Sequence, residues 1–332
     1  MEHTVLLRND GTATAFGRND VGQCDIPALE AGLYYTQAIM GVHHTALLRS
    51  DGKVVAVGMN EDGQCDIPPL DNGLTYTQVS AGPTHTVLLR SDGTAVACGG
   101  YLIPLGQCDI PALDAGLTYT QVAAGGLHTV LIRSDGMAVA CGWSTSGQCN
   151  IPPLEAGLTY TQAAAGELHT ALLRSDGTVI IFGFTFADLM GSSATERGAH
   201  YTQIAAGAGH TVLLRSDGSA TAIGRNTAGQ CNIPVLEAGF TYLQVAAGVG
   251  HTVLIRSDGT AIAFGNHNFG QCDIPTPPSG RCFTIAFPST RVLSAACVDS
   301  GDDVLIRLLG MSGEEHWSYP PILPAESSWT AV

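Results

Sequence analysis

The feature that most constrains this fold is a phrase that recurs at a nearly constant spacing. The stretch "HTVLLRSDGTAVACG" runs from His85 to Gly99, and near-copies of it occur along the chain. Its His-Thr pair occurs seven times, with successive separations of 41, 41, 43, 41, 41 and 41 residues. Such regularity indicates one supersecondary unit copied in tandem. The repeated histidines are His3, His44, His85, His128, His169, His210 and His251.

A second phrase, Gly-Gln-Cys, keeps the same phase. The copy expected near position 190 is missing, and "FTFADLMGSSATERGAH" stands in its place. Cysteines in equivalent positions of a ring of repeats are too far apart to form disulfides. We expect free thiols that act as small apolar side chains, and hence a reducing intracellular compartment, cytoplasm or nucleus. The cysteines of this phrase are Cys24, Cys65, Cys108, Cys149, Cys231 and Cys272.

One copy of the repeat, from Thr75 to Pro111, predicts short strands joined by turns. "TYTQVSAG" alternates and ends in glycine, "HTVLLR" is apolar, and "TAVACG" is a second small apolar run. "SDG" between the last two is a turn sequence, because Ser and Asp bond back to the backbone and Gly accepts positive φ. These features predict three strands, and we expect a fourth near "DIPAL". No window shows helical periodicity over ten or more residues.

The strands are apolar or small on both faces. Val87 and Leu89 lie on one face of their strand, and Thr86 and Leu88 lie on the other. A sheet that is dry on both faces needs neighbours on both, and sheets packed radially around an axis satisfy this. Hydrophobic residues make up 45% of the chain, with 41 glycines, which suits many short strands and tight turns. We therefore predict an all-β, seven-bladed β-propeller.

The two ends of the array predict how the ring closes. The first copy starts on "HTVLLRNDG" without a "YTQVAAG" strand before it, while the last copy runs into "GRCFTIAFPS". Phe283 then occupies the position of Tyr242, so we expect a strand near 281–288, within Cys282–Phe287, to complete the first blade. The propeller would span residues 1–288. Residues 289–332 are a C-terminal extension, read as a hairpin plus a Pro-rich tail. The alternative is a fragment of a longer array.

The pattern "AGxxHTVLLRSDGTAVAxGxNxxGQ" resembles the repeat of the regulator-of-chromosome-condensation family, whose members are seven-bladed propellers. "GMNEDGQ" at Gly58–Gln64 and "GRNTAGQ" at Gly224–Gln230 match the family's Gly-x-Asn-x-x-Gly-Gln element. The resemblance covers roughly Met1 to Phe287. The family usually has leucine after Gly-Gln, where this chain has cysteine.

The resemblance implies a scaffold rather than one activity. Members of the family include a nucleotide exchange factor for a small GTPase, a light receptor, propellers attached to ubiquitin-ligase domains, and inhibitors of β-lactamase. A shared fold does not choose among these functions.

Charge and hydropathy limit the kinds of binding partner that this chain can have. The formal net charge is −15, which disfavours nucleic acid and anionic membranes as partners. No apolar run reaches the roughly 20 residues that a membrane span needs, so no membrane insertion is expected. The opening "MEHTVLLRND" lacks the basic start of a signal peptide. We expect the propeller to be a monomer.

Repeated polar residues have a structural interpretation and a functional one. The seven histidines could form a ring of metal ligands. We favour the reading in which each imidazole bonds the backbone of its own blade. The recurring Arg-x-Asp, as in Arg49 and Asp51, could form a charged binding ring, but we expect Asp to tighten the turn and Arg to pair or pack locally. No catalytic set or phosphate-binding loop stands out from the repeat, so we predict no enzyme activity, no cofactor and no metal.

Function is expected where the copies differ. The two residues before each repeated histidine and the loop after each "TAVAxG" should lie on one face, and the invariant "SDG" turns on the other. The loops of blades 3, 4 and 5 are apolar, and the pairs before the histidine add Leu127 and Leu168. Clustered apolar and aromatic residues on a surface mark binding sites. The predicted partner-binding residues are Tyr101, Leu102, Ile103, Leu105, Trp143, Phe184, Phe186, Leu189 and Met190.

We therefore predict a non-catalytic scaffold that binds a partner protein through the variable loops of blades 3–5. One alternative is a regulatory propeller that acts in small-GTPase nucleotide exchange or recruits substrates for ubiquitination. Another is a structural subunit of a large assembly. The sequence does not identify the partner.

Overall fold

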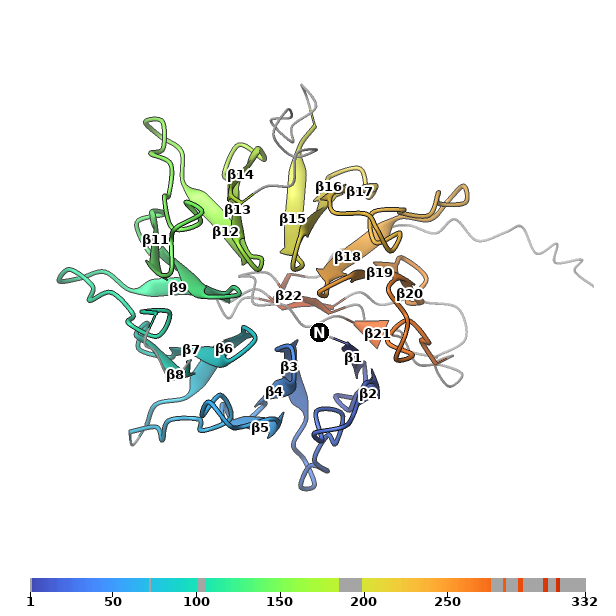
Figure 1. Ribbon diagram of the computed structural model, residues 1–332, viewed down its shortest axis with the longest axis horizontal. Coiled ribbons are helices and arrows are strands. Elements are labelled where there is room, and N and C mark those ends of the chain that lie inside the picture. Colours follow the sequence, from blue (N-terminus) through green and yellow to red (C-terminus); the bar gives the residue numbers. More distant parts are fainter. Residues whose placement is uncertain are drawn as a thin grey trace, which may run out of the picture.

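The computed structural model describes residues 2–71, 73–100, 105–184 and 199–275, and four short strands beyond them. Seven three-stranded antiparallel sheets are arranged around a centre as the blades of a propeller (Figure 1). The seven-bladed all-β fold predicted from the repeat is therefore confirmed. Within the described residues there is no helix of the length and apolarity that a membrane span requires.

Each blade takes three strands in chain order, apart from blade 1, which takes its first strand from the C-terminal side. Blade 1 is β21 (Phe283–Thr284), β1 (His3–Arg8) and β2 (Ala13–Gly17); blade 2 is β3 (Tyr35–Met40), β4 (His44–Arg49) and β5 (Val54–Gly58); blade 3 is β6 (Tyr76–Ala81), β7 (His85–Arg90) and β8 (Ala95–Gly99); blade 4 is β9 (Tyr119–Ala124), β10 (His128–Arg133) and β11 (Ala138–Gly142); blade 5 is β12 (Tyr160–Ala165), β13 (His169–Arg174) and β14 (Val179–Gly183); blade 6 is β15 (Tyr201–Ala206), β16 (His210–Arg215) and β17 (Ala220–Gly224); blade 7 is β18 (Tyr242–Ala247), β19 (His251–Arg256) and β20 (Ala261–Gly265).

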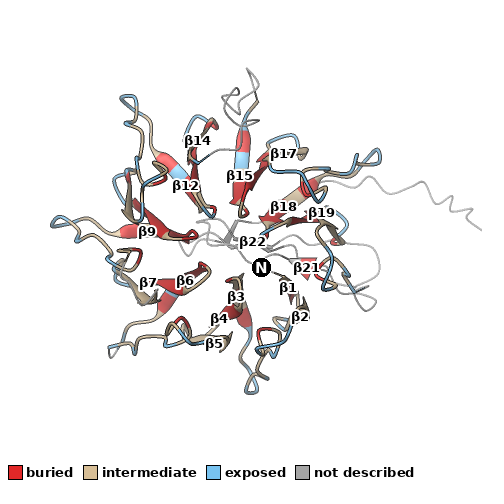
Figure 2. Ribbon diagram, viewed as in Figure 1, coloured by how far each residue is buried: buried red, intermediate tan, exposed pale blue. Residues whose placement is uncertain are grey.

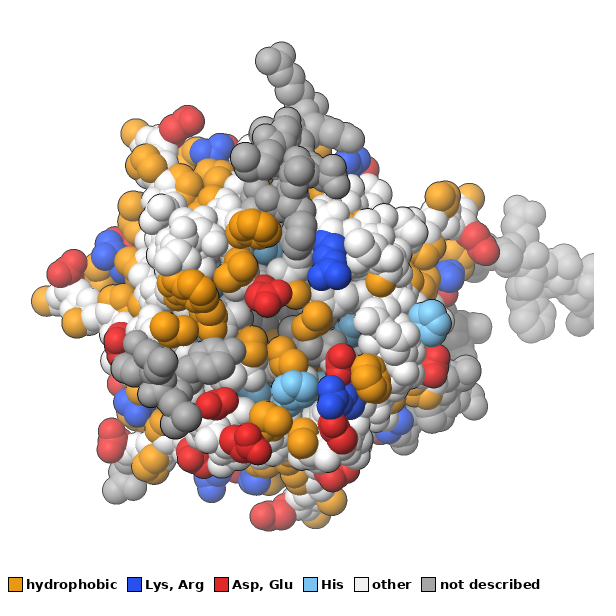
Figure 3. All heavy atoms as spheres, viewed as in Figure 1, with side chains coloured by type: hydrophobic (Ala, Val, Ile, Leu, Met, Phe, Trp, Pro, Cys, Tyr) orange, Lys and Arg blue, Asp and Glu red, His pale blue; other side chains and the backbone are white. Residues whose placement is uncertain are grey.

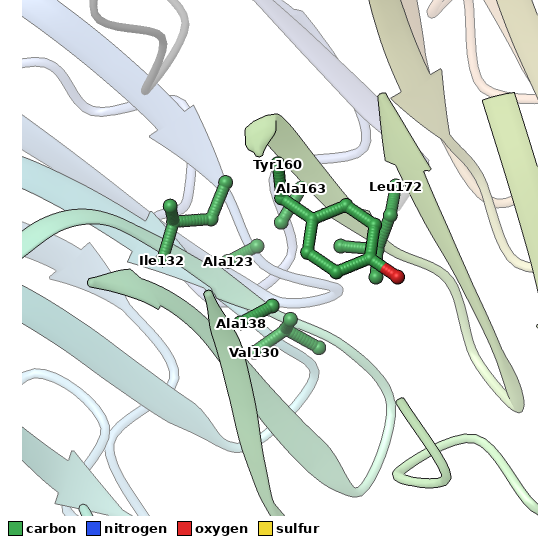
Figure 4. Close-up of a cluster of buried hydrophobic side chains, with 7 residues drawn as sticks. All are labelled: Ala123, Val130, Ile132, Ala138, Tyr160, Ala163 and Leu172. Carbon is green, nitrogen blue, oxygen red and sulfur yellow. The ribbon is translucent and has the colours of Figure 1, made fainter. Parts of the chain in front are cut away.

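The core lies between the blades rather than inside any one of them. On β10, Val130 and Ile132 pack towards blade 5, while Leu131 packs towards blade 3. The cluster between blades 4 and 5 is drawn in Figure 4, where Tyr160 and Leu172 of blade 5 lie against the side chains of blade 4. Buried residues lie mostly in the strands, and exposed residues in the turns and loops at the rim (Figure 2). Each face of a blade is thus shielded from water, because a neighbouring blade packs against it.

The segment expected to supply a fourth strand packs on its blade without joining the sheet. Residues 109–113 form no strand, and the sheet of blade 3 holds only β6, β7 and β8. Pro111 has no backbone N–H to donate to a ladder. Its carbonyl instead accepts a 2.7 Å hydrogen bond from the Tyr119 hydroxyl, and Ile110 and Leu113 cover the blade's core. The fourth-strand prediction was wrong because the segment is held by the side chains of Ile110 and Leu113 and by a tyrosine hydroxyl, and it forms no backbone ladder with β8.

The first blade is completed from the far end of the array. β21 pairs with β1, with Phe283 opposite Arg8, and Phe283 is buried against Leu6 and Ile255. The Phe283 N–H bonds the Gly259 carbonyl at 3.1 Å, as the first-strand tyrosines do in other blades. The remainder of 281–288 lies outside the described residues, and the boundary at 288 stays a prediction. In the extension, β22 (Val292–Ser294), β23 (Arg307–Leu309) and β24 (Glu315–His316) form a separate three-stranded sheet.

The repeated Arg and Asp residues act locally, as predicted. In blade 2 the Arg49 guanidinium donates to the Asp51 carboxylate at 2.7 Å, and Asp51 also accepts the Lys53 N–H at 3.2 Å. The Arg133 and Asp135 pair of blade 4 has the same arrangement. These contacts fold the turn back on itself, and exposed ion pairs of this kind add little stability beyond that.

The seven repeated histidines join neighbouring blades. The His128 Nε2 lies 2.9 Å from the Thr170 hydroxyl of blade 5, and that hydroxyl donates to the Gln148 carbonyl at 2.7 Å. Because the hydroxyl proton is used on Gln148, Nε2 must be the donor to Thr170. The expectation of a backbone partner within the same blade was wrong. The ring comprises His3–Thr45, His44–Thr86, His85–Thr129, His128–Thr170, His169–Thr211, His210–Thr252 and His251–Thr4, at 2.8–3.1 Å.

Thr170→Val is expected to lower the free energy of unfolding by about 2–4 kcal/mol, because it leaves the buried His128 N–H and the Gln148 carbonyl without their partner. Valine keeps the shape of threonine, so the loss reports the hydrogen bonds. The matched control is Thr161→Val, since the exposed Thr161 only donates to the Leu173 carbonyl at 3.3 Å. That change should cost less than about 0.5 kcal/mol. Urea unfolding of both variants checks this, and equal losses would contradict a role for the ring.

Candidate functional site

The variable loops and the residues before each histidine share one face, which we call the upper face. The Trp143 N–H donates to the Leu127 carbonyl at 2.9 Å, and the Phe184 N–H donates to the Leu168 carbonyl at 2.8 Å. In both pairs, the first residue after the third strand meets the residue before the histidine. The Ser-Asp-Gly turns lie at the opposite ends of the strands, on the lower face. The chain direction predicted from the sequence therefore places the variable residues together.

Figure 3 looks onto the upper face. Hydrophobic side chains gather over the blades drawn in green in Figure 1, while charged side chains lie mostly over the blue blades. Trp143 and Phe184, which the backbone bonds above place on this face, have 39% and 50% of their surfaces exposed. Leu105 is half-buried in the loop of blade 3. The other predicted binding residues, Tyr101, Leu102, Ile103, Phe186, Leu189 and Met190, lie outside the described residues.

The Gly-Gln-Cys phrase closes the loop that presents Trp143. Cys149 donates its backbone N–H to the Ser144 hydroxyl at 3.1 Å and its thiol to the Trp143 carbonyl at 3.6 Å. The buried Gln148 accepts the Ser146 N–H at 3.1 Å. These hydrogen bonds within residues 143–149 therefore fix the loop without a contribution from a partner. A preorganised aromatic side chain loses little entropy on binding.

The backbones of blades 4 and 5 meet just before the repeated histidines of the two blades. The Gly126 N–H donates to the Gly166 carbonyl at 2.9 Å, across the boundary between the blades. A Cβ at position 126 would lie 2.3 Å from the Glu167 carbonyl oxygen, so only glycine permits this approach. Leu127 and Leu168 follow these residues and carry the backbone bonds to Trp143 and Phe184. The exposed Glu167 lies at this contact between the blades, directly before Leu168.

Glu167 was not among the predicted site residues. The sequence did offer one indication: Glu167 is the first of the two residues before His169, and the second, Leu168, had been assigned to the predicted apolar surface. Its position depends on the close approach at Gly126, which a linear reading does not reveal. Among the described residues no arginine, lysine or histidine forms an ion pair with Glu167, whereas Glu2 of blade 1 pairs with Arg18 at 2.6 Å.

Burial holds the repeated histidines and cysteines in their neutral forms. Desolvation lowers the pKa of His128 to about 3 and raises the pKa of the Cys108 thiol to about 11. At neutral pH these side chains are therefore an uncharged imidazole and an unreactive thiol. Within the described ranges, no three His, Cys, Asp or Glu residues are grouped so as to hold a metal ion.

Comparison with known proteins agrees with the repeat and the fold. The repeat of the regulator of chromosome condensation (RCC1) matches residues 119–148, 201–230 and 243–271. No curated protein matches the chain by sequence.

Three solved structures show the same architecture at low identity. Prp20p from Saccharomyces cerevisiae is 18% identical with a TM-score of 0.65, covering 83% of this chain and 84% of that chain. Yeast RCC1 (Prp20) with bound Kap60 is 21% identical with a TM-score of 0.60, covering 72% and 71%. The ectodomain of the Arabidopsis thaliana receptor kinase ACR4 is 18% identical with a TM-score of 0.61, covering 79% and 90%. The repeat phrases, the matched repeats and the seven-bladed ring agree: this chain carries RCC1 repeats and has the fold of the RCC1 propellers.

Proposed function

We propose that this propeller is a non-catalytic scaffold that binds a partner protein through the upper face of blades 3–5. The observation that carries the proposal is the exposure of Trp143 and Phe184, by 39% and 50%, on adjacent blades of one face. Aromatic residues such as tryptophan are enriched among the hot spots of protein interfaces. Prp20p, a relative in fold, is described in complex with Kap60 and with binding properties to Gsp1p and histones, which supports a protein as the partner.

The proposal is tested by affinity capture from the source cell, followed by mass spectrometry. The Trp143→Asp, Phe184→Asp double variant is expected to lose the wild-type partner, because each change puts a charge into the apolar contact. The matched control is Met137→Asp, since Met137 is also 39% exposed on blade 4 but follows its Ser-Asp-Gly turn on the lower face. Circular dichroism confirms that each variant is folded.

Capture by the double variant equal to that by the wild type would overturn the proposal. Loss with Met137→Asp alone would move the site to the lower face. The identity of a partner captured through the upper face also separates the classes of function: a small GTPase released by added nucleotide indicates exchange, a ubiquitin-ligase component indicates substrate recruitment, and a stoichiometric salt-resistant complex indicates a structural assembly.

A further inference from the structure

The upper face at blades 4 and 5 combines exposed aromatic rings with a hydrogen-bond donor. Trp143 and Phe184 are 39% and 50% exposed, and the half-buried Leu127 and Leu168 carry the carbonyls that their N–H groups bond. Among the residues that the structure describes, none accepts a hydrogen bond from the indole N–H of Trp143. An indole N–H can only donate, so it suits a ligand that brings a free acceptor to an apolar surface.

The C-terminal extension carries a sequence with this chemistry. Residues 318–324 read "SYPPILP", with an apolar Ile-Leu pair between Pro320, Pro321 and Pro324. Proline-rich segments favour the polyproline II conformation, which has no internal hydrogen bonds and so leaves its carbonyls free as acceptors. Such segments dock on surfaces lined by aromatic side chains. An indole N–H in such a surface can donate to one of the free carbonyls.

The chain is long enough to bring residues 318–324 to blades 4 and 5. The propeller strand β21 ends at Thr284, and the separate sheet of the extension runs from Val292 to His316. At about 3.3 Å per residue, the segments 285–291 and 317–324 together reach roughly 50 Å when extended. A compact domain of the propeller's length is also roughly 50 Å across. No part of the upper face is therefore beyond the reach of this segment.

We propose that residues 318–324 dock on Trp143 and Phe184 of their own chain, and that the partner displaces them. This inference rests on the proposed function, because it assigns a second, competing occupant to the same surface. The contact is intramolecular, so a segment of low intrinsic affinity still covers the surface. Glu326 is the only charged residue after His316, so little charge opposes the burial of this segment on apolar side chains. Competition from the docked segment lowers the apparent affinity of the partner.

Tryptophan fluorescence of the full-length chain tests the docking. The chain has three tryptophans, so Trp317→Phe with Trp329→Phe leaves Trp143 as the only one. Acrylamide quenching of Trp143 is compared between this parent and a variant in which alanine also replaces the three prolines of 318–324. The replaced prolines lie outside the propeller strands, and circular dichroism checks that both proteins are folded.

The alanine variant is expected to raise the quenching constant of Trp143 about 2-fold, because a segment that is no longer preorganised docks more weakly and uncovers the indole. The matched control moves the tryptophan to the lower face, through Met137→Trp and Trp143→Phe in the same background. Met137 is also 39% exposed, and a tryptophan there should be quenched equally with either tail.

Three results would overturn the inference. The first is equal quenching of Trp143 with the proline and alanine tails. The second is a change of the same size at position 137, because the effect would then not belong to the upper face. The third is protection of Trp143 that disappears on dilution, because the docked segment would then come from a second copy of the chain.

Partner capture separates this inference from the proposed function. With the wild-type tryptophans in place, the alanine tail is expected to retrieve about 3-fold more partner than the wild-type tail, since it competes less. A change in quenching without a change in capture would mean that the segment docks where the partner does not bind, which counts against the proposed function. Unchanged quenching, combined with loss of the partner in the Trp143→Asp, Phe184→Asp double variant, would leave the proposed function standing without a docked tail.

Discussion

Acidification from pH 7 to pH 4.5 is expected to unfold this propeller in one cooperative transition. The cause is the ring of buried imidazoles between the blades. Desolvation lowers the pKa of His85 and His128 from 6.5 to about 3, and that of His44 and His169 to about 4. The other three members, His3, His210 and His251, are lowered to about 3, 4 and 3, again chiefly by burial.

The direction of the effect follows from the protons that each state binds. The unfolded chain protonates these histidines near pH 6.5, whereas the folded chain keeps them neutral to about pH 4 or below. Stability is therefore complete above pH 6.5 and is lost as the pH falls towards the folded pKa. At pH 5 each histidine opposes folding by about 2 kcal/mol, so seven oppose it by about 14 kcal/mol, comparable with the whole stability of a domain.

The transition is measured by urea unfolding at a series of pH values. The repeated aspartates titrate at lower pH than this transition. Hydrogen bonds from Thr94 and Arg133 lower the pKa of Asp92 and Asp135, respectively, below 3.8. His128→Gln keeps an N–H donor for Thr170 but removes one titrating group, so it should reduce the pH slope by about 1.4 kcal/mol per pH unit. An unfolding free energy that stays constant between pH 6.5 and 5 would contradict this account of the ring.

Gly142→Ala is expected to cost more than about 4 kcal/mol, because the new Cβ has no space and an unfavourable backbone. Gly142 has a φ of +111°, and the added Cβ would lie 2.5 Å from the Leu127 carbonyl oxygen and 2.7 Å from the His128 Cα. Both are backbone atoms of the paired strand, so neither can move aside alone. The same glycine directs the chain into Trp143, so the variant should also lose partner capture.

The matched control for this change is Gly157→Ala. Gly157 also has a positive φ, +86°, but no atom lies within 4 Å of its added Cβ. Only the backbone conformation is penalised there, at about 1–2 kcal/mol. Urea unfolding of the two variants therefore separates strain from collision. Equal losses would show that the approach of β11 to β10 is looser than these distances imply.

The repeat was sufficient to predict the fold because its period, its two-faced strands and its turn sequence all require the same architecture. The local partners within a turn, such as Arg49 and Asp51, could also be predicted, since they are two residues apart. The hydrogen-bond partner of each histidine could not be predicted, because the repeat period does not reveal which residues of neighbouring blades come into contact. His128 and Thr170 are 42 residues apart and meet only when blades 4 and 5 pack.

The candidate site was predicted in part for the same reason. The loops that differ between repeats identified Trp143 and Phe184, and the alternation of strand direction placed them on one face. Glu167 was missed because its position depends on the contact made at Gly126, where a missing side chain lets two blades approach. The segment after Cys108 was misread as a strand because its apolar residues were weighed without the missing N–H of Pro111.

The central claim is that the partner lies on the upper face at blades 4 and 5. Site-specific photo-crosslinking tests it most directly, with p-benzoylphenylalanine placed singly at Trp143, at Phe184 or at Tyr34. Tyr34 is 51% exposed and accepts the N–H of Ser50 in the turn of blade 2, on the lower face. The account predicts partner crosslinks from positions 143 and 184 and none from position 34. Crosslinks from position 34 without any from 143 or 184 would contradict it.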